Sequence, residues 1–279
     1  MNSPTTMKPP AKTNNPHQCQ FSLHDDNVYH IMTFLELNFI IGTCMMVSKQ
    51  WNEQARKVPI KLSLHSVNNN PFVHLNLTDL EVGGPKMNEF CDWIIDSPQM
   101  IHLTALKIRG EFMSPLGDES CERVANCPHL SNLTCLKLPM NEIGNDGCKS
   151  IINSLYLTKL RELDLSFNIF TGKALKEMEN SSVMTNLTSL SLAGLYYTTS
   201  IQSLLTNANM CNLKKLDLSN LNYNYIRKLE AGSNLCNLTR LNLNNNRMKI
   251  NTTTTVMQNK FPKLKYLDLS FNEINDEQL

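Results

Sequence analysis

One spacing of apolar residues recurs along most of the chain. In its clearest copy, Leu160, Leu163 and Leu165 are followed by Asn168. Leucines that alternate with polar residues predict a short strand with one buried face, and the asparagine predicts a turn out of that strand. Copies begin at positions 72, 103, 133, 160, 187, 213, 238 and 264, which are 25 to 31 residues apart. A period of this length predicts a solenoid of packed units.

The apolar period changes in the second half of each unit. Cys148, Ile151, Ile152 and Leu155 stand three or four positions apart, which predicts an amphipathic helix. Strands stack about 4.8 Å apart, whereas packed helices need about 8–10 Å. The expected fold is therefore α/β: a curved parallel sheet with its strands on the concave side and helices on the convex side.

Asparagine recurs where the predicted strands end, at Asn141, Asn168, Asn246 and Asn272. We expect these amides to bind backbone groups of the neighbouring unit, because each buried unpaired group costs about 1–3 kcal/mol. Asp118 and Asp146 stand near two expected helix starts, where a carboxylate can cap free N–H groups.

This layout resembles the leucine-rich-repeat family, specifically its ribonuclease-inhibitor-like and cysteine-containing subclasses. The segment Asn-Glu-Ile-Gly-Asn-Asp-Gly-Cys at 141–148 is similar to the turn into the helix of the first subclass, and Cys-Pro-His-Leu at 127–130 to the helix exit of the second. The resemblance implies a repeat domain over 61–279 with about eight repeats. No C-terminal cap follows the last turn, so we expect either a truncated array or another molecule that covers this end.

A different pattern precedes the repeats. Residues 1–20 are rich in proline, threonine and asparagine and are expected to form a disordered tail, not a signal peptide. Apolar residues three and four positions apart over 21–56 predict short helices. A segment of this size cannot bury a large core, so we expect it to need a partner or to pack on the first repeat.

Two parts of this head, 23–35 and Val47-Ser48-Lys49-Gln50-Trp51, resemble the F-box, the small all-α module that docks on the Skp-type adaptor of cullin-RING ubiquitin ligases. The resemblance implies an F-box-like module over 21–60. The family usually has proline after the first leucine, where this chain has His24. The alternative is a helical cap that closes the solenoid. Contacts with the adaptor or within the module core are expected from Leu23, Ile31, Leu35, Leu37 and Ile40.

Composition narrows the choice of partners and compartments. A net charge of +1 and a pI of about 7.6 favour neither nucleic acid nor an anionic membrane. The longest nearly apolar stretch, 39–47, is far shorter than the roughly 20 residues of a membrane span. Nine cysteines without a CxxC pair favour neither a disulfide framework nor a zinc site, and Cys211 and Cys236 are expected to be buried free thiols. We expect a cytoplasmic or nuclear protein.

Six Asn-x-Ser/Thr sequons are the argument for a third hypothesis, a secreted recognition receptor. Three of them, at Asn132, Asn186 and Asn237, share one register of the repeat. No export signal accompanies them. Repetition in an asparagine-rich chain therefore explains them better than glycan attachment does.

Asp164, Asp217 and Asp268 recur in the pattern Asp-x-Ser. They fall on alternate predicted strands, so neighbouring carboxylates are roughly 9.6 Å apart, too far to share a metal ion. We interpret them as a solvated polar column with Lys215 and Arg240 as counter-charges. All seven histidines precede residue 130, and no glycine-rich phosphate loop is present. We therefore expect no catalytic residue, metal ion or cofactor.

Candidate target contacts come from the predicted strand face. Lys107 and Lys137 fall on adjacent strands, with Arg109 beside them, and would attract a phosphorylated or acidic segment. The alternative is that Asp79, Glu81 and Glu142 neutralise these cations. Exposed apolar residues give a second set, whose members either anchor a partner or pack over the turns: Met140, Phe167, Tyr196, Tyr266 and Phe271.

These observations favour a non-catalytic substrate-recognition subunit of an SCF-type cullin-RING ligase. The F-box-like head would bind the adaptor, and the repeats would bind a target protein. The alternative is an intracellular leucine-rich-repeat scaffold or regulator whose helical head is only a solenoid cap.

Overall fold

The chain divides at Val58/Pro59 into two compact units. The computed structural model describes residues 59–64, 76–83, 91–92, 94–110, 115–195, 201, 204, 207–221, 234–248 and 261–273, all in the second unit. Residues 21–58 of the predicted F-box-like module, including its five predicted adaptor contacts, lie outside the described residues, and Pro59 and Ile60 at its predicted end begin a strand. The expected terminal tail and the end of the last repeat lie outside them as well.

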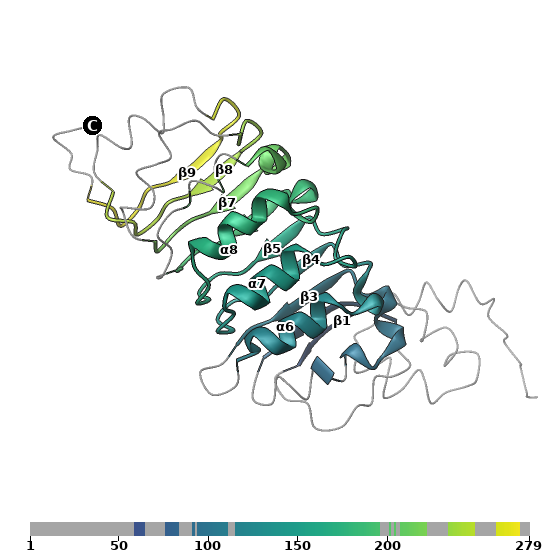
Figure 1. Ribbon diagram of the computed structural model, residues 1–279. Helices are drawn as coiled ribbons and strands as arrows, with labels where there is room; N and C mark the ends of the chain where they lie inside the picture. Colours follow the sequence, from purple (N-terminus) through teal and green to yellow (C-terminus); the bar gives the residue numbers. More distant parts are fainter. Residues whose placement is uncertain are drawn as a thin grey trace, which may run out of the picture. The chain divides into compact units, whose positions relative to one another are not determined.

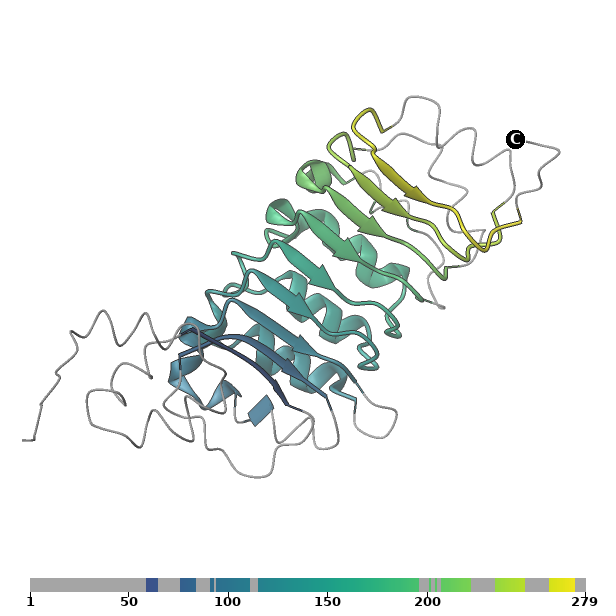
Figure 2. The same cartoon turned by 180° about the vertical axis from the view of Figure 1, so that it is seen from behind.

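The described strands form one parallel sheet in which every strand pairs with the next one in the sequence. Figures 1 and 2 show this order from β1 to β9. The strands are β1 (Pro59–Leu64), β2 (Asn76–Val82), β3 (Ala105–Ile108), β4 (Cys135–Lys137), β5 (Glu162–Asp164), β6 (Ser189–Ser191), β7 (Lys215–Asp217), β8 (Arg240–Asn242) and β9 (Tyr266–Asp268).

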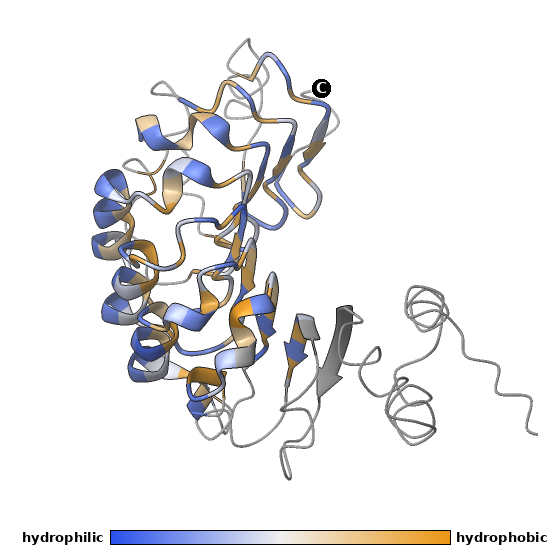
Figure 3. Cartoon of the chain, turned by 90° about the vertical axis from the view of Figure 1, so that its right-hand side faces the viewer, coloured by the Kyte–Doolittle hydropathy of each residue, from blue (hydrophilic) through white to orange (hydrophobic). Residues whose placement is uncertain are grey.

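Helices cover one face of the sheet and leave the other face open (Figures 1 and 3). They are α6 (Gly117–Ala125), α7 (Asn145–Ile152) and α8 (Gly172–Glu177), with 3₁₀ turns η2 (Pro98–His102), η3 (Pro128–Leu130), η4 (Met178–Asn180), η5 (Met184–Asn186) and η6 (Ala208–Asn212). None of the helices described is both long and apolar enough for a membrane span. The predicted α/β solenoid with a parallel sheet is confirmed.

The core lies between the strands and the helices. The central leucine of each strand from β4 to β8 is at most 2% exposed, because it points away from the open face; these are Leu136, Leu163, Leu190, Leu216 and Leu241. Apolar residues of the helices meet them, among them Val124, Ile151 and Leu175, which are fully buried. The two sequence periods therefore supply the two sides of one continuous core.

The first repeat has a different frame from the predicted one. Leu80 of β2 pairs with Leu106 of β3, and Glu81 pairs with Lys107. The copy therefore begins at Leu77, which places it 26 residues before the next copy at Leu103 by subtraction. The prediction that it begins at position 72 was wrong because two overlapping frames alternate equally well, and only pairing with β3 fixes the register. Strand β1, which was not predicted, precedes it.

The predicted asparagine ladder is confirmed at Asn168, which is 2% exposed. Its Oδ1 accepts hydrogen bonds from the N–H groups of Asn141 (2.9 Å) and Ile143 (3.0 Å). Its Nδ2 donates to the carbonyls of Leu138 and Leu165, both at 2.9 Å. Corresponding bonds are made by Asn141, Asn246 and Asn272. Each of these side chains therefore satisfies backbone groups of the preceding unit.

A second asparagine column explains the repeated sequons. The Nδ2 groups of Asn132, Asn186 and Asn237 donate to backbone carbonyls of the preceding repeat at 2.7, 2.9 and 2.8 Å. The threonine two positions later donates its hydroxyl to the preceding repeat in each case. The Asn-Leu-Thr register therefore joins successive repeats through hydrogen bonds to the backbone.

The predicted capping by Asp118 and Asp146 was wrong. No side chain caps α6 or α7 at its N-cap residue. Asp118 Oδ1 instead accepts a hydrogen bond of 2.6 Å from the Gly144 N–H in the following repeat. The sequence places a carboxylate near a helix start, but the partner comes from the neighbouring unit.

The cysteines fall into two groups. Cys91, Cys121 and Cys148 are buried in successive repeats, and burial raises the pKa of the Cys91 thiol to about 12 and that of Cys148 further. Cys211 and Cys236 are free but exposed, so the prediction that they are buried was wrong. They stand before the strand, in surface turns whose inward positions are taken by Met210 and Leu235.

Candidate functional site

The open face of the sheet carries two rows of side chains, because residues on either side of the buried central leucine point away from the core. The start row holds the first residue of each strand from β4 to β9: Cys135, Glu162, Ser189, Lys215, Arg240 and Tyr266. The end row holds the third residue: Lys137, Asp164, Ser191, Asp217, Asn242 and Asp268.

The predicted cations Lys107 and Lys137 lie on adjacent strands, as expected. Lys107 Nζ lies 3.3 Å from Asp79 Oδ1 and 3.9 Å from Glu81 Oε2. Lys137 Nζ lies 3.7 Å from Glu162 Oε2. Both cations are therefore already paired, and Glu162 takes the place expected for Glu142. Lys107 and Lys137 therefore offer no unpaired positive charge to a phosphate group at this end of the sheet.

Electrostatics at Lys107 agree with this pairing. Partial burial acts to lower the pKa of Lys107, but the hydrogen bond to Asp79 and the charges of Asp79 and Glu81 outweigh it and raise the pKa. The third predicted cation, Arg109, is exposed, and its Nη2 lies 3.9 Å from the sulfur of Met140.

Three of the predicted apolar contacts stand in the turns just before the ladder asparagines. Met140, Phe167 and Phe271 have φ angles of 60°, 55° and 55°. This left-handed conformation is uncommon for bulky residues, and its repetition is imposed by the ladder turn. Met140 is 41% and Phe271 83% exposed. Tyr196 lies outside the described residues.

Phe167 packs over the following turn. A Cβ atom at Gly194 would stand 2.3 Å from Phe167 Cδ1, so the ring lies directly on that glycine. Gly194 itself has a φ of 67°. Of the two roles open to Phe167, the structure therefore shows packing over the turn.

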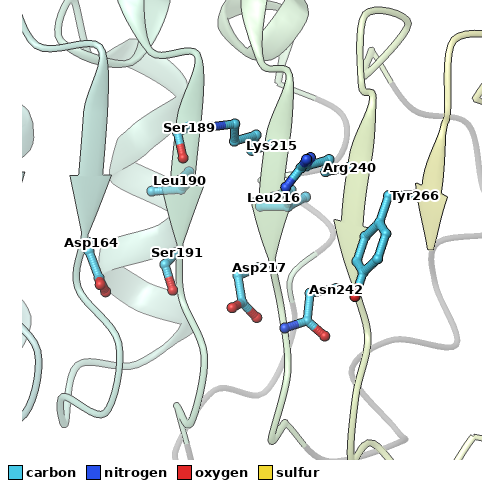
Figure 4. A pocket seen from close by; sticks show the side chains of 10 residues that line it. All are labelled: Asp164, Ser189, Leu190, Ser191, Lys215, Leu216, Asp217, Arg240, Asn242 and Tyr266. Carbon is cyan, nitrogen blue, oxygen red and sulfur yellow. The ribbon is translucent and has the colours of Figure 1, made fainter. Parts of the chain in front are cut away.

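A shallow depression of about 290 Å³ lies on the open face over β5 to β9. Figure 4 shows Lys215 and Arg240 near the strand starts, and Asp164, Asp217 and Asn242 nearer the strand ends. The other lining residues are Ser189, Leu190, Ser191, Leu216 and Tyr266. Charges of opposite sign therefore lie on opposite sides of one depression.

The cations of this depression differ from those of β3 and β4. Lys215 and Arg240 are direct cross-strand neighbours, both exposed. Neither has an acidic side chain within ion-pair distance among the residues that the structure describes. The Arg240 guanidinium lies 5.8 Å from the ring centroid of Tyr266, which is 52% exposed. Lys215 and Arg240, which were expected to be counter-charges of the aspartate column, thus form no ion pair with its aspartates in the described part of the chain.

The aspartates of the end row close the turns that follow their strands. Asp164 Oδ1 accepts from the N–H (2.9 Å) and hydroxyl (2.6 Å) of Ser166. In the same way, Asp217 accepts a hydrogen bond of 2.9 Å from the N–H of Ser219, and Asp268 accepts one of 2.9 Å from the N–H of Ser270. Hydrogen bonds from Ser270 lower the pKa of Asp268, so that carboxylate is charged at neutral pH. The Asp-x-Ser pattern is thus a turn motif.

Sequence reasoning missed Lys215 and Arg240 as candidate contacts, although the signal was available. Both occupy the start row in adjacent repeats, one position before the buried leucine, and Tyr266 follows in the next repeat. The prediction followed only the residue after that leucine. Within the described part of the chain, no cluster of His, Cys, Asp or Glu is arranged to hold a metal ion.

Comparison with known proteins agrees with this geometry. A sequence profile of the leucine-rich repeat matches residues 129–151, 156–178 and 262–277. These segments of the chain are leucine-rich repeats. A search of curated protein sequences gives no significant match.

Two solved structures are similar to this chain in fold. A protein from Bacteroides fragilis is 15% identical with a TM-score of 0.58, over 81% of this chain and 72% of that one. InlP of Listeria monocytogenes is 17% identical with a TM-score of 0.50, over 88% of this chain and 66% of its own length, which is slightly less than two thirds. At such identities the likeness supports the fold and no shared ligand.

Proposed function

We propose that this leucine-rich-repeat protein is a non-catalytic receptor that holds a partner protein on its open sheet face. The observation that carries this proposal is the depression over β5 to β9, with exposed Arg240 and Tyr266 on a sheet whose backbone is fixed by inter-repeat hydrogen bonds. Arginine and tyrosine are enriched among residues that dominate protein–protein affinity. A rigid sheet also loses little conformational entropy when it binds.

The second half of the proposal concerns the head. The resemblance of Val47-Ser48-Lys49-Gln50-Trp51 to the F-box supports docking on a Skp-type adaptor of a cullin-RING ubiquitin ligase, in the cytoplasm or nucleus. Such a receptor needs no catalytic residue. It raises the local concentration of its target at the ligase, so that a bimolecular encounter becomes an intramolecular one.

Adaptor binding tests the ligase role. The full chain is mixed with a purified Skp-type adaptor at micromolar concentration, and the complex is measured by size-exclusion chromatography with light scattering. We expect a complex that Leu35→Asp abolishes. Leu155→Asp is the matched control, since Leu155 in the repeats is 86% exposed and should tolerate the same change.

Absence of a complex with the unmodified chain would overturn the ligase role. The protein would then be a leucine-rich-repeat scaffold whose head closes the solenoid, and His24 in place of the usual proline favours this second reading. In that case, removal of residues 1–58 should lower the free energy of unfolding of the repeats without affecting any adaptor.

A further inference from the structure

We propose that the depression over β5 to β9 recognises an extended protein segment in which an acidic and a basic side chain stand two positions apart. This inference deepens the proposed receptor function and rests on it. The acidic side chain would bind Lys215 and Arg240 beside the Tyr266 ring. The basic side chain would bind the carboxylates of the end row, foremost Asp217.

The start row supplies the first part of the argument. Lys215 and Arg240 are paired across β7 and β8, and like charges in this position repel unless an anion lies between them. At the other cationic pair, Lys107 and Lys137, acidic side chains of this chain supply that anion. At Lys215 and Arg240 no acidic residue in the described ranges does so. A carboxylate from a partner fits this place.

The Tyr266 ring restricts the positions that the Arg240 side chain can take. Its position beside the guanidinium, at 5.8 Å, restricts Arg240 and leaves the N–H edge of the guanidinium available to a planar carboxylate. Figure 4 shows the ring flanking the depression from β9. A carboxylate can therefore bind both cations with little further ordering of the site.

The end row supplies the second part. Asp217 follows Lys215 by two residues on the same strand, and Asp164 lies two strands away on the same side. Their Oδ1 atoms are held by the turns at 219 and 166, so the carboxylates cannot swing toward the cations. A ligand that carried only negative charge would meet these fixed carboxylates and be repelled.

Strand geometry gives the spacing of the ligand charges. Side chains two residues apart on a strand are separated by about 6.6 Å and point to the same side. An extended segment along β7 presents its own alternate side chains at the same spacing. An acidic and a basic residue at positions i and i+2 therefore match the two rows, whereas adjacent charges would point to opposite sides.

Fluorescence anisotropy with three labelled peptides tests this match on the full chain. One peptide repeats Thr-Glu-Thr-Lys, the second contains the same residues with glutamate and lysine adjacent, and the third replaces every lysine of the first by glutamate. The first should bind about ten-fold more tightly than either of the others, and the difference should shrink in high salt. Equal affinity for the first two would overturn the spacing argument.

Variants locate the binding. Lys215→Glu with Arg240→Glu should weaken the alternating peptide about ten-fold, while Lys176→Glu on the helix face should leave it unchanged. Asp217→Asn keeps the turn acceptor and should remove the preference for the alternating over the all-glutamate peptide. Loss of binding with Lys176→Glu equal to that of the double variant would overturn the site.

Adaptor binding and peptide binding together distinguish a failure of the charge-pattern site from a failure of the proposed ligase role. The double variant should still bind the Skp-type adaptor, which also shows that it is folded. If the peptide results hold and the adaptor fails to bind, the charge-pattern site stands and the ligase role falls. If the adaptor binds but all three peptides bind equally, the charge-pattern site falls and the ligase role stands.

Discussion

The asparagine ladder makes the strongest stability prediction, at Asn168. Replacement of Asn168 by alanine removes the acceptor of two backbone N–H groups, those of Asn141 and Ile143, and the donor to three backbone carbonyls. Asn168 itself is only 2% exposed to solvent. Water therefore cannot replace the amide without a rearrangement of the turn.

The magnitude follows from the orphaned donors. Each buried N–H group without an acceptor costs about 1–3 kcal/mol, so the two groups together predict a loss of about 2–6 kcal/mol in the free energy of unfolding. Carbonyls lose less, because they retain a second lone pair and other partners. The cost falls on two adjacent repeats, since Asn168 joins its own turn to the preceding one.

Urea unfolding followed by circular dichroism measures the loss, and amide hydrogen exchange shows where it falls. Asn168→Ala should lower the protection of the Asn141 and Ile143 amides first. The matched control is Asn212→Ala, because Asn212 is exposed and makes a single bond of 2.8 Å to the Thr185 carbonyl; it should cost about 1 kcal/mol or less. If Asn168→Leu is as stable as the unmodified chain, the reasoning is refuted.

Three further predictions test other parts of the structure. Gly194→Ala should lower the free energy of unfolding by about 1–3 kcal/mol in urea, because Gly194 has a φ of 67° and the Phe167 ring lies on it. The loss should be smaller in a chain that already carries Phe167→Ala, and an unchanged loss would contradict the packing of Phe167 on Gly194. In the native protein at pH 8, a thiol reagent should label Cys211 and Cys236 but not Cys91 or Cys148, since burial raises the pKa of the latter two; mass spectrometry should find labelled buried cysteines only after unfolding. Lys107→Ala should lower the free energy of unfolding by no more than about 1 kcal/mol, since its ion pairs are partly exposed, and a larger loss would show that the pairs are structural.

Much of the fold was predictable because its determinants are local and repeated. A period of two residues followed by one of 3.6 fixes a strand and a helix, and repetition fixes their stacking. The ladder at Asn168 followed from the same logic, since a buried turn needs a side-chain partner. The frame of the first repeat could not be predicted in this way, because Leu77 belongs to both candidate frames and only pairing with β3 distinguishes them.

The candidate site was only partly predictable for a different reason. The sequence shows which residues face outward, but it does not show which charges are already paired. Lys107 and Lys215 are both outward-facing lysines in the sequence, one after and one before a buried leucine, and the structure separates them by the carboxylates within reach of each. In the same way, Phe167 and Phe271 occupy one repeat position, yet only Phe167 has been shown to cover a following glycine.

Photo-crosslinking in cells tests the central claim, that the open sheet face is the receptor surface. A benzophenone side chain is introduced at position 266 on that face or at position 176 on the helix face, and crosslinked proteins are identified by mass spectrometry. We predict a partner that crosslinks from position 266 and not from 176, and that is lost with Lys215→Glu and Arg240→Glu. The same partner captured from position 176, or retained by the double variant, would contradict the claim.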